Sequence, residues 1–138
     1  MLSKIKQEFY SILDENLEYD IRDYALIDDS EATIFPQIFL KLENVTRDKM
    51  KDKFIYQMRF KIDIYSDYIG EKEIMDLEAK IFELSQKLYD DANITYVREN
   101  GFRIIDDKST GSILKHGIIN YQVIVAGMEV EDEEHTNS

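Results

Sequence analysis

Residues 54–65 alternate apolar and polar side chains over their whole length, which constrains the fold more than any other feature of this sequence. Six apolar residues occupy one set of alternate positions, and a mostly polar set occupies the other. Successive side chains of a strand point to opposite faces of a sheet, so this period of two predicts a long strand with one buried face. At about 3.3 Å per residue the strand would span about 40 Å, so we expect it to extend past the core of a small domain.

Two segments carry apolar residues at the spacing of an amphipathic helix, residues 2–17 and residues 71–89. The second segment has acidic residues in its first turns, where the helix dipole favours negative charge. We expect the second helix to pack on the apolar face of the long strand. The predicted core then includes Phe60, Ile62, Ile64, Leu77, Ile81 and Leu84.

Shorter apolar runs predict the remaining strands. Pro36 favours extended backbone in its neighbourhood, so it suits the start of a strand. The predicted strands occupy residues 37–43, 94–97, 102–106 and 118–125, with a further extended piece near 24–27. Residues 44–53 and 107–112 have the polar composition of loops. The first of these loops would form the tip of a hairpin with the long strand.

This succession of elements predicts a single α+β domain over residues 1–128. The expected architecture is an antiparallel sheet of about four strands, with two main helices packed on it, in the order α-β-β-α-β-β. A long β-hairpin projects from it. Residues 129–138 contain five acids and no lysine or arginine, and we expect them to form a disordered acidic tail.

The charged residues lie in blocks along the chain. Residues 14–31 hold eight acids and one arginine, whereas residues 41–61 hold seven bases and three acids. Blocks of opposite sign can set the orientation in which like subunits meet. The predicted acidic surface comprises Asp20, Asp23, Asp28 and Asp29. The predicted basic contact surface, at the hairpin tip, comprises Arg47, Lys49, Lys51 and Lys53.

The overall composition disfavours several classes of protein. A net charge of −12 repels nucleic-acid backbone and anionic lipid, so we expect neither specific nucleic-acid binding nor a membrane partner. No apolar run approaches the length of about 20 residues that crosses a bilayer. The sequence contains no cysteine, which excludes a disulfide framework and a thiolate metal site. No secretory signal is visible at the N-terminus, so we expect a cytoplasmic site of synthesis.

Candidate chemical groups are few, and their spacing is unfavourable. His116 and His135 have no partner at the spacing of metal ligands. Asp76, Glu78 and Lys80 superficially match a nuclease set, but Glu78 and Lys80 point about 200° apart around a helix. We therefore expect no catalytic residue, no metal ligand and no cofactor, and we expect that the protein is not an enzyme.

Three parts of the sequence resemble the tail-completion, or tail-terminator, family of long-tailed phages and phage-like particles. The first part is a strand that ends in Tyr65-Ser66, followed by a loop that ends at Gly70 and a helix with an apolar stripe. It resembles the middle of the sequences of that family. The strand led by Pro36 is similar to the family's first strand, and the apolar alternation after His116-Gly117 is similar to its closing strand. Members often have tryptophan where this chain has Tyr65.

The resemblance implies a structural protein rather than an enzyme. Members form a ring, usually a hexamer, that caps the tail tube and joins it to the head connector. The implied partners are further copies of this chain, the tail tube protein and the head connector protein, while DNA at most passes through. The implied location is the neck or tail of a virion or phage-like particle, assembled in the bacterial cytoplasm.

Two other classes of function stay open at the level of sequence. A small acidic inhibitor or immunity-type protein would use one acidic face to mask a basic partner surface. An enzyme that uses carboxylates and a divalent ion would need several acids to converge in one cleft. The first alternative predicts a monomer or dimer, and the second predicts binding of a divalent metal.

Overall fold

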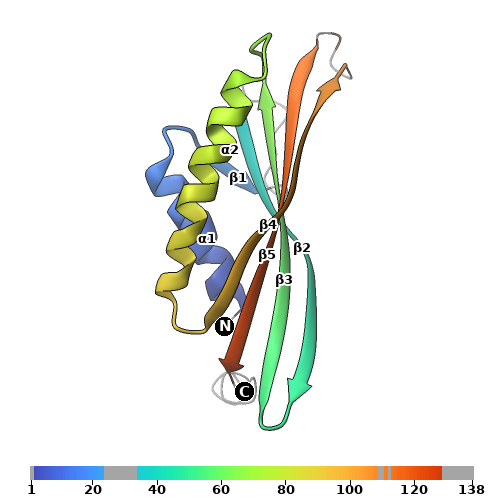
Figure 1. The fold of residues 1–138 in the computed structure, drawn as a ribbon. Coiled ribbons are helices and arrows are strands. Elements are labelled where there is room, and N and C mark those ends of the chain that lie inside the picture. The colour runs from blue at the N-terminus through green and yellow to red at the C-terminus, as the bar shows by residue number, and fades with distance from the viewer. Residues whose placement is uncertain (1, 24–33, 109–110, 112, 129–138) are drawn as a thin grey trace.

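Five strands and two α-helices make up the part of the chain that the computed structural model describes, residues 2–23, 34–108, 111 and 113–128 (Figure 1). The elements in chain order are α1 (Leu2–Asn16), β1 (Ile21–Asp23), β2 (Gln37–Met50), β3 (Lys53–Ser66), α2 (Lys72–Ser85), the 3-10 helix η2 (Gln86–Asp90), β4 (Ile94–Asp107) and β5 (Leu114–Met128). The protein is therefore α+β, as the sequence predicts. The extended piece expected near 24–27 and the tail 129–138 lie outside the described residues.

The sheet is mixed and has the strand order β1-β2-β3-β5-β4. The three neighbouring pairs from β2 to β4 are antiparallel, but β1 runs parallel to β2, with Ile21 opposite Ile38. The expectation of about four antiparallel strands is wrong in these two respects, and the order becomes α-β-β-β-α-β-β. The reason is that β1 has only three residues, too few for alternation to reveal.

The loop expected at residues 44–53 is mostly strand. β2 continues to Met50, which pairs with Lys53, so that only Lys51 and Asp52 form the turn. Lys51 has a φ of 53°, the positive value that the first residue of a two-residue hairpin turn adopts. This stretch of β2 is polar because it has little core to cover, and its composition therefore imitates a loop.

Residues 94–97 and 102–106, expected as separate strands, form the single strand β4. A register irregularity between Glu99 and Gly101 interrupts its pairing with β5, and Gly101 has a φ of 151°. A bulge of this kind bends a strand without ending it. The helix expected to reach residue 89 ends its α-helical part at Ser85 and continues as η2.

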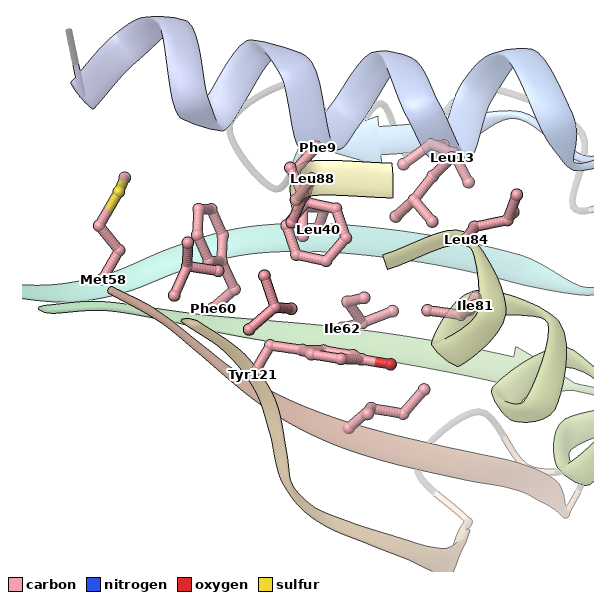
Figure 2. Close-up of a cluster of buried hydrophobic side chains, with 14 of the residues drawn as sticks. Phe9, Leu13, Leu40, Met58, Phe60, Ile62, Ile81, Leu84, Leu88 and Tyr121 are labelled. Atoms are coloured by element: carbon pink, nitrogen blue, oxygen red, sulfur yellow. The ribbon is translucent and has the colours of Figure 1, made fainter. Parts of the chain in front are cut away.

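Both helices lie on the same side of the sheet, and the core fills the space between them and the strands (Figures 1 and 2). Phe9 of α1 packs edge-to-face on Phe60, at 5.1 Å between ring centroids, and on Tyr121, at 5.7 Å. All six residues expected in the core are buried: Phe60, Ile62, Ile64, Leu77, Ile81 and Leu84.

Gly117 on β5 allows α2 to approach the sheet closely. A Cβ atom at this position would lie 2.5 Å from Cγ2 of Ile74 and 3.7 Å from Cβ of Ile64. Ile74 is completely buried on α2 and has a stiff, β-branched side chain. The absence of a side chain at residue 117 therefore sets the distance between this helix and the sheet.

The β2–β3 hairpin extends past the ends of both helices as a long arm (Figure 1). An irregularity in the pairing between Leu42 and Asn44 lies near the middle of β2. Such a bulge increases the local twist of a strand. The sheet thus has one part covered by the helices and a second part, the arm, that projects beyond them.

Candidate interaction surfaces

The four basic residues expected at the tip of the hairpin are all exposed, but they do not lie on one face. Arg47 and Lys49 belong to β2 and pair with Tyr56 and Phe54, on the side of the sheet that carries the helices. Lys51 occupies the turn. Lys53 precedes Phe54 on β3, so alternation directs it to the other side. The arm therefore presents positive charge to both sides and at its end.

Arg47 is fixed along the arm by two aromatic rings. Its guanidinium carbon lies 5.6 Å from the ring centroid of Tyr56 and 5.9 Å from that of Phe54. A guanidinium over an aromatic face is attracted by the ring, by about 0.5–1 kcal/mol at an exposed site. Thr46 adds a hydrogen bond from its hydroxyl to Oε1 of Gln57, at 3.3 Å. These contacts give a projecting arm a defined shape.

The residues expected to form an acidic surface are only partly described. Asp20 is exposed immediately before β1, and the backbone of Asp23 ends that strand. Asp28 and Asp29 lie outside the described residues. The expected acidic surface is therefore represented here by its first member, Asp20.

A buried carboxylate lies on the sheet face opposite the helices. Asp63 is completely buried, and its Oδ1 is 2.6 Å from Nε2 of His116, which pairs with Tyr65 and is therefore the diagonal neighbour of Asp63 on β5. Lys61 is 3.6 Å from Oδ2 of the same carboxylate. The ring of Tyr65 stacks on that of His116, with centroids 4.2 Å apart. Burial raises the pKa of Tyr65, and the negative charges of Asp63 and Asp107 add to this effect.

This arrangement neutralises a buried charge and holds an imidazole in a fixed orientation. Nε2 of His116 is occupied by Asp63, and one face of the ring is covered by Tyr65. The sequence predicts no partner for His116 at metal-ligand spacing and a last strand that begins at residue 118, whereas His116 is part of β5. The alternation in β3 indicated the face of Asp63, but only the register between β3 and β5 brings the two residues together.

A second acidic contact joins α2 to the edge strand β4. Glu99 pairs with Tyr121 across the sheet and meets Glu78 of α2. Burial first, and then the hydrogen bond and the charge of Glu78, together raise the pKa of Glu99 to about 7. Oε1 of Glu99 and the hydroxyl of Tyr121 are both buried, and neither has a hydrogen-bond partner among the described residues. Asp76 and Lys80, considered with Glu78 from the sequence, are exposed.

An open groove of about 800 Å³ separates α1 from the segment around η2. Lys4 on its rim lies 3.6 Å from Glu8 and 3.8 Å from Asp91. Burial and the charge of Asp91 raise the pKa of Glu8. The groove is lined mostly by charged and polar side chains of both segments, and Nζ of Lys87 donates to Oδ1 of Asn16 across it, at 3.4 Å.

Within the described ranges, no group of three or more histidine, aspartate or glutamate side chains is placed to hold a metal ion. In the same part of the chain, no helix combines the length and the apolar character that crossing a bilayer requires. No family model matches this sequence, and no curated protein matches it.

Proposed function

We propose that this chain is a structural protein of a phage or phage-like particle. Copies of it form a ring, a hexamer as is usual in the family it resembles, that terminates the tail tube and joins it to the head connector. DNA passes through the ring without specific contacts. The proposed location is the neck or tail of the particle, after assembly in the bacterial cytoplasm.

The arm is the observation that carries this proposal. It extends past both helices, its basic residues are exposed, and Arg47 is held over two aromatic rings (Figure 1). The pairing of β3 with β5 ends at Phe54 and Met128, so only β2 and β3 form the end of the arm, and a lone strand pair contributes little to the stability of its own chain. Such an element suits contact with a neighbouring subunit or with the end of a tube.

Native mass spectrometry of the purified chain tests the proposal. The expected result is a species of six copies of the 16.3 kDa chain, either alone or on co-expression with a tail tube protein. The double change Arg47→Glu/Lys49→Glu should weaken this assembly and leave the circular dichroism spectrum unchanged. The charge-conserving change Arg47→Lys/Lys49→Arg is the matched control and should assemble normally.

The alternative of an acidic inhibitor is supported by the acidic helices and gives a different result. It predicts a monomer or dimer in every condition, because an inhibitor needs one free face and no ring. A chain that stays monomeric at high concentration and also with the tube protein would refute the ring proposal. Unchanged assembly of the Arg47→Glu/Lys49→Glu variant would refute the role of the arm alone.

A further inference from the structure

Three neighbouring rows of side chains in the middle of the sheet face opposite the helices are basic, although the chain as a whole carries a net charge of −12. Residues that pair across strands share one face of a sheet. Arg59 of β3 and Arg98 of β4 both pair with Gln122 of β5, and Lys41 pairs with Lys61 in the next row. The adjoining row adds Arg22, opposite Phe39, and Arg103, opposite Ile118.

These cations outnumber the acids around them. Six basic side chains occupy the three rows, while the acids there are Glu43, at the bulge, and Asp63. Asp63 is buried and already bound to His116 and Lys61. The exposed cations of this basic sheet face are Lys41, Arg59, Arg98 and Arg103. For the three arginines of this set, the described part of the chain supplies no ion pair.

The opposite side of the molecule is acidic. Residues 2–20 and 71–91, which comprise the helices and the residues next to them and which we name the acidic helix layer, contain twelve acids and five lysines. Two of these lysines are engaged with acids of the same layer, Lys72 with Asp76 and Lys4 with Glu8 and Asp91. Exposed acids of the layer include Asp14, Glu15, Glu18, Glu83 and Asp90.

The helix layer also exposes apolar surface. Met75 and Phe82, two turns apart on one flank of α2, expose 54% and 45% of their surface. Both lie outside the buried stripe of this helix. An apolar strip bordered by acids is the composition of a surface that makes protein contacts.

We infer that the basic sheet face binds the acidic helix layer of a second copy of this chain. This inference rests on the proposed function and specifies which surfaces join the subunits. The two faces lie on opposite sides of one molecule, so each contact leaves one face of each kind unused (Figure 1). A contact of that kind is heterologous, and it gives a closed ring when the rotation between neighbouring copies closes and an open filament when it does not. The second copy is favoured over a polyanion such as DNA, because the total charge of the chain repels a polyanion.

Reciprocal charge reversal tests the inference by light scattering after size-exclusion chromatography. The variant Arg59→Glu/Arg98→Glu should lower self-association at least about tenfold, and so should Glu15→Lys/Glu83→Lys. An equimolar mixture of the two should assemble again, because each reversed face then meets a partner of opposite sign. Far-ultraviolet circular dichroism of each variant verifies that it is folded.

A matched control separates the face from the total charge. The change Lys108→Glu/Lys115→Glu alters the net charge as much as Arg59→Glu/Arg98→Glu does, but it places the change just after β4 and at the start of β5, outside both faces. It should assemble as well as the unmodified chain, and equal loss in both variants would overturn the inference.

The remaining outcomes are also decisive. If the unmodified chain assembles and the two reversed variants assemble equally well, the inferred contact is wrong and the ring proposal stands. If the unmodified chain never assembles, both proposals fail. If it stays monomeric but binds duplex DNA at low salt, and Arg59→Glu/Arg98→Glu abolishes this binding, the basic face is a nucleic-acid site and the inference is overturned.

Discussion

Replacing Glu99 by glutamine should stabilise the protein at alkaline pH. In the folded state Glu99 lies against Glu78, partly buried, and its pKa is raised to about 7 from the ordinary value of 4.5. The folded chain therefore binds a proton, between pH 4.5 and pH 7, that the unfolded chain has released. The free energy of unfolding must fall as the pH rises through this window, and the loss is complete above pH 7.

The expected magnitude follows from the shift in the pKa. One pKa unit corresponds to 1.36 kcal/mol, so the shift of Glu99 sets an upper limit of about 3 kcal/mol. Solvent screens a side chain that is only half-buried, which reduces the effect to about 1–2 kcal/mol. Glutamine carries no charge at any pH, so Glu99→Gln should gain this amount at pH 8 and almost nothing at pH 5.

Urea unfolding at pH 5 and at pH 8, at one protein concentration, measures the difference. The change Glu83→Gln, at an exposed position of α2, the helix that carries Glu78, is the control and should not alter the pH dependence. Parallel curves for the unmodified chain and Glu99→Gln would show that Glu99 does not retain its proton in the folded state. A variant less stable at pH 8 would show that the carboxylate makes a favourable contact, which contradicts the reasoning.

Two further changes test the packing of the core by the same assay. Phe60→Ala should lower the free energy of unfolding by about 3–5 kcal/mol, because Phe60 is buried against Phe9; a loss below about 1 kcal/mol would mean that this face of β3 is not the core face. Gly117→Ala should cost about 1–3 kcal/mol, because the added methyl group would overlap Ile74; an unchanged stability would show that α2 moves away freely.

The sequence predicts those helices and strands in which a single segment buries one of its own faces against the core. β3 alternates apolar and polar residues, because the helices cover one of its sides. The polar half of β2 and the three residues of β1 carry no such signal, since their strand geometry comes from pairing with a neighbour. The bulge before Gly101 likewise interrupts the apolar pattern of β4 without ending the strand.

The clusters of charged side chains depend on which residues of neighbouring strands lie opposite each other. This register is set by two segments together, so neither segment reveals it alone. Asp63 and His116 are 53 positions apart, and their contact requires β5 to lie next to β3. The contact of Glu99 with Glu78 requires in addition that α2 lies along the side of the sheet that ends in β4. Composition indicated the basic block at 41–61, but only the pairing of strands shows that Arg98 and Arg103 join part of it on one face.

The position of β5 between β3 and β4 has a consequence for how the chain is made. While residues 114–128 are still being synthesised, β3 has an open edge and β4 has no sheet to join. An open edge of that length is a template for unwanted pairing with other chains. Pairing of β5 with β3 and β4 closes that edge and completes the basic sheet face in one event. Unfinished chains on neighbouring ribosomes therefore lack the basic sheet face by which finished subunits would recognise each other.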